Sequence, residues 1–320
     1  AEQGTDVTVI PEHDVYDNTS VTTFDLLQIR QHILTTSLLD SPYKMIAADI
    51  NNNGTIAASD LVAARQVILG MATSYPNNNA WAFVDAAYEF PTNWSLNDGY
   101  PAVTNFNNIV ANETANFVAV RIGDVNGTYG FADSADERNS MIIKANDATL
   151  AAGQEVTVEF TAADAVLGYQ FTLNFENLEV VSIDGNEENF GVFANAITTS
   201  FDAKASDRLF SVTFKATADV TVSEAIALTS NITKAEAYST NGAMNIALEF
   251  ANANADFALY QNTPNPVKDI TNVSFNLPTA GAATITVSDM TGKVVSVING
   301  EYAKGYNEVT LSNLPAGVLT

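Results

Sequence analysis

The sequence contains no cysteine and only two histidines, His13 and His32, among 320 residues. Without cysteine the chain forms no disulfide, holds no thiolate-bound metal and uses no cysteine nucleophile. It also lacks any run that approaches the ~20 apolar residues needed to cross a bilayer, so no transmembrane helix is predicted. An exported chain without disulfides needs another means of stiffening, and a bound metal ion is one option.

Positive charge is scarce as well, because 13 Lys and Arg face 37 Asp and Glu and give a net charge of −24. Such a surface repels nucleic acid and anionic membranes and suits bound divalent cations. We therefore predict no nucleic-acid partner and no membrane insertion. Charged residues make up only 16% of the chain and apolar residues 47%, which indicates folded domains, two or three from the length.

Signatures of catalysis are missing too. No G-x-S-x-G, H-E-x-x-H, P-loop or G-x-G-x-x-G motif occurs. His32 lies on a predicted helix. The chain contains an internal repeat, described below, in which Val67 is the position equivalent to His32, so a packing or surface role is expected. The plentiful carboxylates leave a glycosidase pair open by counting alone, but no long catalytic domain remains to hold one. We predict that this region is not an enzyme.

The most specific local pattern present is DINNNGTIAASD, from Asp49 to Asp60. Calcium loops place oxygen ligands at positions 1, 3 and 5, a glycine at 6, a backbone carbonyl at 7 and a carboxylate at 12. The predicted Ca²⁺ ligands are therefore Asp49, Asn51, Asn53, the Thr55 carbonyl and Asp60. The alternative is an asparagine-rich turn that caps the following helix at Ser59 or Asp60.

The same pattern recurs 35 residues earlier, where Asp14, Asn18, Asp25, Arg30 and Gln31 match Asp49, Asn53, Asp60, Arg65 and Gln66. The first copy is degraded, since Tyr16 replaces a ligand and Thr19 replaces the glycine. A loop–helix unit that occurs twice, with calcium loops that lack an entering helix, resembles the dockerin module. The resemblance implies a small α-helical fold with Ca²⁺ as its bound ion, and a second ion near Asp14, Asn18 and Asp25.

A third fragment, IGDVNGT from Ile122 to Thr128, resembles the opening of another dockerin loop. No carboxylate at position 12 and no helix follow it. Two interpretations stay open: Asp124 and Asn126 fold back to complete the degraded first site, or the fragment is an ordinary Asp/Asn/Gly turn.

Between Gly70 and Arg121 the chain is rich in asparagine and aromatic residues. Two interpretations are again open, a platform for stacking sugars or a cover over a small helical core. The aromatic residues are Trp81, Phe83, Tyr88, Phe90, Trp94, Tyr100 and Phe106.

After a polar linker, Phe131–Ser140, the apolar pattern changes to period two in EVTVEF, LGYQFTLNF and RLFSVTFKA. Short alternating strands separated by turn signals over ~115 residues indicate a β-sandwich. Their order resembles the cohesin-like sandwiches, the family that partners dockerins. Within the linker, Asp133-Ser134-Ala135 fits a short bacterial O-glycosylation sequon, so we hypothesise a glycan on Ser134.

The last part, from about Phe257 to Thr320, contains QNTPNP, SDMTGKVV and LPAGV in order. It resembles the type A C-terminal sorting domain of the type IX secretion system. The resemblance implies export to the outer surface of a Gram-negative cell and the type IX machinery as a partner. Family members continue past the position of Thr320, so we expect a clipped chain or a strand supplied by a neighbour.

These observations predict a multidomain protein, a small α-helical dockerin-like calcium module followed by two all-β sandwich domains. The expected boundaries are 1–130, a linker at 131–140, 141–256 and 257–320. The N-terminus has no basic-then-apolar pattern, so we expect the C-terminal part of a larger secreted protein.

The predicted function is that of a calcium-stabilised structural or adhesive protein of the cell surface. It would assemble through its dockerin-like and cohesin-like modules, within one chain, head to tail between copies, by strand donation, or with other surface proteins. The alternative is a carbohydrate-binding or spacer portion of a larger secreted enzyme, with polysaccharide as the ligand.

Overall fold

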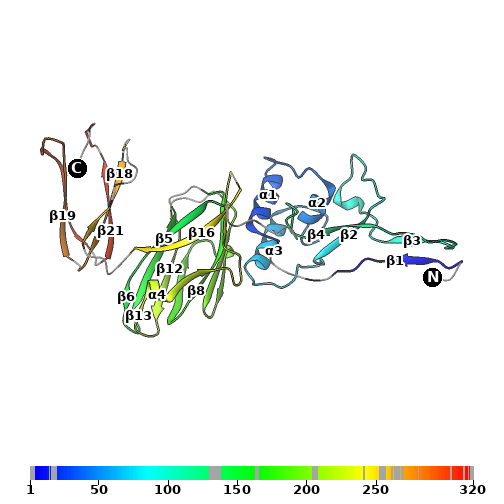
Figure 1. Cartoon of the computed structure of the whole chain (residues 1–320), viewed down its shortest axis with the longest axis horizontal. Helices are drawn as coiled ribbons and strands as arrows, with labels where there is room; N and C mark the ends of the chain where they lie inside the picture. The colour runs from blue at the N-terminus through cyan, green and yellow to red at the C-terminus, as the bar shows by residue number, and fades with distance from the viewer. Residues whose placement is uncertain are drawn as a thin grey trace.

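The computed structural model describes residues 4–13, 15, 20–129, 138–162, 166–203, 208–240, 242–251, 257–260, 262, 267, 270–279, 281–302, 305–312, 314–315 and 317. Three parts follow one another along the long axis in Figure 1. The helical N-terminal module lies at one end, a large β-sandwich lies in the middle, and two small sheets formed by the last strands lie at the other end.

Three helices and two short β-ribbons make up the N-terminal module. Helix α1 is capped by Thr22, whose backbone N–H and side chain bond to Asp25 in a capping box. Helix α2 begins with Ser41 as N-cap and Pro42 in its first turn. The elements are β1 (Val7–Val9), α1 (Thr23–Ile33), α2 (Pro42–Ala48), α3 (Ala58–Ile68), β2 (Trp81–Asp85), η1 (Leu96–Asp98), β3 (Thr104–Phe106) and β4 (Phe117–Arg121).

Helix α2 corrects one expectation, because it ends at Ala48 and therefore enters the loop that begins at Asp49. The resemblance implied loops without an entering helix. The Ser41-Pro42 pair is a standard helix-start signal that explains the difference. Leu61, Ala64, Ile68 and Leu69 are buried, and the first three share one core with residues of α1 and α2.

The β-sandwich holds a ten-stranded sheet, with nine strands in the order β10-β11-β8-β15-β16-β5-β7-β12-β9 and the tenth, β14, paired with β8. Strand β16 pairs antiparallel with β15 in its first part and parallel with β5 in its second, and so joins the two layers. The elements are β5 (Ser140–Asn146), β6 (Thr149–Leu150), β7 (Glu155–Ala162), β8 (Gly168–Phe175), β9 (Leu178–Asp184), η3 (Glu187–Asn189), β10 (Phe190–Phe193), β11 (Ala196–Phe201), β12 (Arg208–Ala216), β13 (Val220–Thr221), α4 (Val222–Ala225), β14 (Ile226–Thr229), β15 (Glu236–Ser239) and β16 (Gly242–Ala251).

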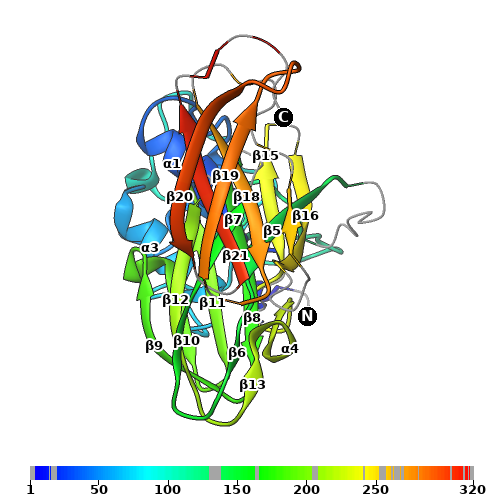
Figure 2. The same ribbon diagram turned by 90° about the vertical axis from the view of Figure 1, so that its left-hand side faces the viewer.

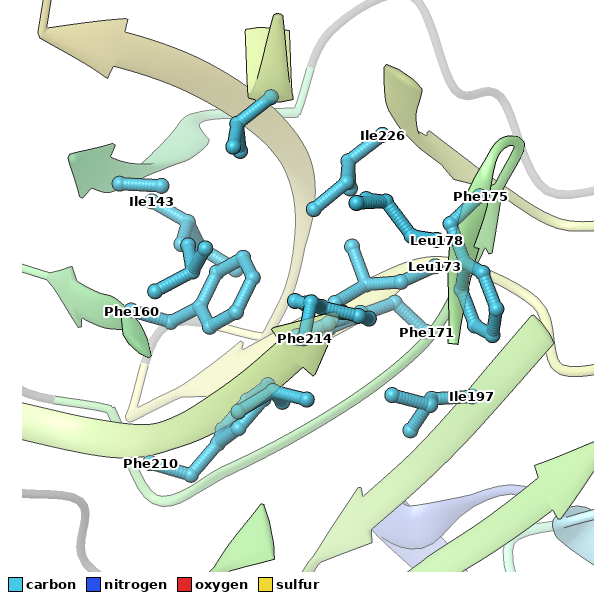
Figure 3. Close-up of a cluster of buried hydrophobic side chains, with 14 of the residues drawn as sticks. Ile143, Phe160, Phe171, Leu173, Phe175, Leu178, Ile197, Phe210, Phe214 and Ile226 are labelled. Carbon is cyan, nitrogen blue, oxygen red and sulfur yellow. The ribbon is translucent and has the colours of Figure 1, made fainter. Parts of the chain in front are cut away.

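The alternating positions of the predicted strands meet between the two layers, as Figure 3 shows for Phe160, Phe171, Phe175, Phe210 and Phe214. The period-two pattern is therefore confirmed. Strand β8 departs from simple alternation, because nearly every one of its residues is buried, including Gln170 and Thr172 on the face away from the core. A second layer of protein must cover that face.

The last strands form a three-stranded sheet, β17-β18-β21, and a two-stranded sheet, β19-β20. They are in front in Figure 2. Phe275 of β18 packs edge-to-face on Tyr302 of β20 and joins the two sheets. Phe275 and Leu277, two positions apart on β18, are buried, and so is Val287 of β19. The strands are β17 (Ala258–Leu259), β18 (Ile270–Leu277), β19 (Gly281–Ser288), β20 (Val294–Tyr302) and β21 (Gly305–Ser312).

Candidate functional site: two cation loops and a docking face

The predicted calcium loop between α2 and α3 is held closed by its own carboxylates. Asp49 accepts hydrogen bonds from the backbone N–H groups of Asn53 (3.0 Å) and Gly54 (2.9 Å). Asp60, in the first turn of α3, accepts one from the N–H of Asn51 (3.1 Å). The structure therefore joins both predicted carboxylates to backbone N–H groups of this loop, with Gly54 in the left-handed conformation that the turn requires.

The donor set of this loop fits Ca²⁺. Among the described residues, Asn51 Oδ1 is buried and accepts no hydrogen bond, although its Nδ2 donates to Ser59. Burial raises the pKa of Asp60, and the nearby Asp49 carboxylate adds to the increase. Two close carboxylates, an unused amide oxygen and the carbonyl position at Thr55 are hard oxygen donors of the kind that Ca²⁺ takes.

The asparagine-rich segment after α3 supports this loop from outside. Asn78 Nδ2 donates to the carbonyls of Asp49 (3.0 Å) and Ile50 (3.2 Å), and Asn97 Nδ2 donates to that of Gly54 (3.4 Å). These bonds tie three backbone carbonyls of the loop to the asparagine-rich segment.

The aromatic residues of the same segment pack on the helical core. Phe90 meets Tyr43, Tyr88 and Trp94 edge-to-face, with ring planes inclined by 75–82°. All four side chains lie against the buried core of the module. This arrangement favours the core-cover interpretation over a flat platform for stacking sugars.

The carboxylate of Asp25, at the start of α1, is fully buried beside Asp124. Asn126 donates its backbone N–H to Asp25 Oδ1 (3.2 Å), and Thr128 donates its N–H to Asp124 Oδ1 (3.0 Å). Burial raises the pKa of Asp25 to about 8, partly opposed by backbone hydrogen bonds, and the Asp124 carboxylate adds to the increase. The structure therefore brings Asp124 and Asn126 to Asp25 across about a hundred residues of chain.

Three predicted positions lie outside the described residues: Asp14, Asn18 and the linker serine, Ser134. Most of QNTPNP lies outside them as well. The ligand roles of Asp14 and Asn18 and the glycan on Ser134 stay predictions. His32 has a structural task, since its Nδ1 accepts the N–H of Leu39 (3.1 Å) after α1.

The face of β8 and β11 that points away from the sandwich core is covered by α1 and α3 (Figure 1). Asp202, just after β11, is its charged centre. Arg30 of α1 binds both carboxylate oxygens of Asp202, through Nε (2.8 Å) and a terminal nitrogen (3.0 Å). Arg65 of α3 binds the same carboxylate. Arg30 and Arg65 are equivalent positions of the internal repeat, so one sandwich carboxylate joins both repeats.

At the N-terminus of α1 the sandwich caps an open helix end. The backbone N–H of Thr23 donates to Gln170 Oε1 (2.6 Å), and the Thr23 hydroxyl bonds to that of Ser200 (2.6 Å). The next residue, Phe24, stacks on Tyr238 of β15 with ring centroids 5.4 Å apart. A helix leaves its first N–H groups unpaired, and here a side chain of β8 takes up one of them.

At the C-terminus of α3 the sandwich satisfies the opposite kind of group. The hydroxyl of Thr233 donates to the carbonyl of Ile68 (2.6 Å), and that of Thr198 donates to the carbonyl of Leu69 (2.8 Å). Gly70 follows with φ +72°, and a Cβ there would lie 2.5 Å from Ile232 of the sandwich. The two helices therefore meet the sandwich through opposite ends.

Sequence reasoning missed this docking face. Gln170, Thr198 and Ser200 occupy the polar positions of alternating strands, which usually face water. Their burial follows only from the module that covers them. One available signal was the repetition of Arg30 as Arg65 in a chain with so few cations.

Comparison with known proteins gives two family matches. Residues 12–69 match the dockerin type I domain, and residues 263–319 match the secretion system C-terminal sorting domain. No match was found among curated proteins. The resemblances to dockerins and to the sorting domain are confirmed, and the latter indicates an exported protein attached to the cell surface. No helix among the described residues is both long and apolar enough to span a membrane.

Similar solved structures are cohesins. A non-cellulosomal cohesin from Archaeoglobus fulgidus has 20% identity and a TM-score of 0.26, over 34% of this chain and 86% of that one. A type I cohesin–dockerin complex from Clostridium thermocellum has 12% identity and a TM-score of 0.28, over 37% and 93%. A type II cohesin dyad from Acetivibrio cellulolyticus has 12% identity and a TM-score of 0.28, over 54% and 77%. Two segments of the chain thus match family models, that of the dockerin type I domain and that of the C-terminal sorting domain.

Proposed function

We propose that this chain is a non-catalytic structural protein of the cell surface, in which the dockerin-like module stays docked on the cohesin-like sandwich of the same chain. The observation that carries this proposal is the buried polar face of β8 and β11. Its side chains bond to the ends of α1 and α3, and Asp202 binds one arginine from each repeat. A face so fully used by its own chain is not open to a second module.

Calcium has a stiffening task in this proposal. The loop at Asp49, Asn51, Asn53, Thr55 and Asp60 would hold one ion and thereby fix the start of α3 relative to α2. The ion would neutralise carboxylates that otherwise repel one another next to a core. Since α3 carries Arg65 and the carbonyls that meet the sandwich, a loaded loop supports the docked arrangement.

The domain limits follow the same division: a calcium module at 1–130, a linker at 131–140, a sandwich at 141–256 and a sorting domain from 257. In such a chain, export through the type IX machinery delivers a stiff two-module unit to the surface. We assign the unit a structural rather than an enzymatic task, because the described contacts join modules instead of forming a catalytic site.

Size-exclusion chromatography with light scattering and small-angle X-ray scattering on the whole chain tests the proposal. A closed unit predicts a monomer at every protein concentration. Its maximum dimension should be the same at the lowest and at the highest concentration. Growth of the particle with concentration would contradict it and would favour head-to-tail assembly of open chains.

A further inference from the structure

Residues 124–129 lie outside the segment that matches the dockerin family, yet they repeat the hydrogen bonds of a dockerin loop opening. Asp124 accepts the backbone N–H groups of Thr128 (3.0 Å) and Tyr129 (2.9 Å). Asp49 accepts the same pair, at 3.0 and 2.9 Å, from the residues four and five positions after it. The two aspartates therefore hold the same place in two loops.

The match continues at the carboxylate that closes each loop. Asp25 accepts the N–H of Asn126 (3.2 Å) on one oxygen and that of Thr22 (2.9 Å) on the other. Asp60 accepts the corresponding pair, at 3.1 and 2.9 Å, from the third loop position and from the residue three before it. In the loop closed by Asp60 all donors come from one segment. In the loop closed by Asp25, the donor Asn126 comes from a segment about a hundred residues away.

Ser20 lies five residues before Asp25, as Thr55 lies five residues before Asp60. Its carbonyl accepts the hydroxyl of Thr128 (3.4 Å), which places it beside the fifth position of the loop. The Ser20 hydroxyl is buried, with the residue 4% exposed, and has no hydrogen-bond partner among the described residues. A buried hydroxyl without a partner is the kind of group that a bound ion or water satisfies, and it belongs to the residue whose carbonyl lies at the fifth loop position.

We propose that the N-terminal module binds a second Ca²⁺ in a composite loop, formed by residues 124–129 and 20–25 rather than by one continuous segment. The ligands are two carboxylates, an amide oxygen, a hydroxyl and a carbonyl: Asp124, Asp25, Asn126, Thr128 and Ser20. Their charge of two negatives equals that of the loop at Asp49 and Asp60. This inference rests on the calcium binding of the proposed function, but not on the docking of the modules.

The composite loop has a consequence for the whole module. An ion there would tie residues 124–129 to the start of α1, and so would close residues 26–123 into a loop. Asp25 caps the same helix end whose Thr23 bonds to Gln170 and Ser200 of the sandwich. The ion would thus fix the point where the chain leaves the module and the helix end that meets the sandwich.

Native mass spectrometry of the whole chain in calcium tests this assignment, because it counts ions directly. The wild type should carry two Ca²⁺, and Asp124→Asn and Asp49→Asn should each carry one. The matched substitution Asp14→Asn should still carry two, since it lies in the continuous segment that the composite loop replaces. Thr128→Val, which removes only a hydroxyl, should lose the second ion at calcium concentrations that still saturate the first.

The outcomes separate the two proposals. Loss of an ion in Asp14→Asn and not in Asp124→Asn would overturn the composite loop in favour of a continuous one. A single ion in the wild type, lost in Asp49→Asn, would also overturn it and leave the proposed function intact. No ion in the wild type would remove calcium from both. Hydrogen exchange at Thr128 and Tyr129 should slow on adding calcium, and unchanged exchange in a two-ion chain would count against the assignment.

Discussion

The two repeats of the N-terminal module reach the same contacts from different pieces of chain. In the second repeat, the loop from Asp49 to Asp60 and helix α3 follow one another without interruption. In the first, the closing carboxylate Asp25 accepts the N–H of Asn126, which lies after the second repeat and the aromatic segment. A degraded copy in the sequence can therefore still receive contacts from a distant segment of the chain.

The repeats also differ at the docking face. Arg65 has 7% of its side chain exposed and Arg30 has 38%, although both bind Asp202, which has 3% exposed. Charge burial, and with it the energetic weight of each pair, is therefore uneven between positions that the sequence makes equivalent.

Removing the shared carboxylate should have the largest effect. Asp202→Ala leaves the buried Arg65 without its partner and should lower the free energy of unfolding by about 3–5 kcal/mol. Urea unfolding of the whole chain measures it. Asp184→Ala is the matched control, since Asp184 pairs with Arg208 on the same sandwich but both side chains are more than half exposed, at 68% and 52%. That control should cost about 1 kcal/mol or less, and equal losses would contradict the account.

Substituting Arg65 and Arg30 one at a time tests whether the two repeats contribute unequally to the docking face. Arg65→Ala should destabilise by about 3 kcal/mol because it uncovers a buried carboxylate. Arg30→Ala should cost about 1 kcal/mol, since its side chain is partly in water. Thermal unfolding at several salt concentrations should show that only the Arg30 variant approaches the wild type as salt rises. The reverse order would show that the two pairs are assigned wrongly.

Withdrawing calcium should affect both repeats. At a free calcium concentration a hundred times the Kd, each ion contributes about 2.7 kcal/mol of stability. Asp49→Asn should therefore melt at a lower temperature than the wild type in calcium. In excess chelator the wild type should lose its advantage. A melting temperature of the wild type that chelation leaves unchanged would refute a stabilising ion.

The smallest effect is expected at a single hydrogen bond between modules. Thr198→Val keeps the shape of the side chain but removes the donor to the Leu69 carbonyl, for about 1 kcal/mol. Thr213→Val is a suitable comparison, because the Thr213 hydroxyl bonds to Thr157 on an exposed part of the sandwich. In urea unfolding, Thr198→Val should have a lower free energy of unfolding than Thr213→Val. Indistinguishable free energies would argue against a closed interface.

Much of this architecture could be predicted from local pattern. Alternation placed Phe160, Phe171 and Phe214 in the sandwich core, and the D-x-N-x-N-G run identified a loop whose first aspartate accepts backbone N–H groups of the same loop. Helix α2 was not predicted, although the Ser41-Pro42 pair is a helix-start signal. These features depend on neighbouring residues, which is why sequence reasoning reaches them.

The docking face could not be predicted in the same way. Gln170 and Ser200 resemble ordinary outward-facing residues, and Asp202 is one of 37 acidic residues. Their roles depend on contacts with α1 and α3, far away in the sequence. Asp124 and Asn126 stand between these cases, because their motif left open a return to the first loop or an ordinary turn, and the fold brings them to Asp25 of the first loop.

The docking of the module on its own sandwich is tested most directly by trapping it with a disulfide, which the absence of cysteine makes simple. The hydroxyls of Thr23 and Ser200 are 2.6 Å apart, so the chain with Thr23→Cys and Ser200→Cys should oxidise to a disulfide within one chain. Peptide mapping and non-reducing gels should show a monomer at every dilution, and each single variant should stay reduced. Free thiols in the double variant, or disulfides that only link different chains, would contradict the account.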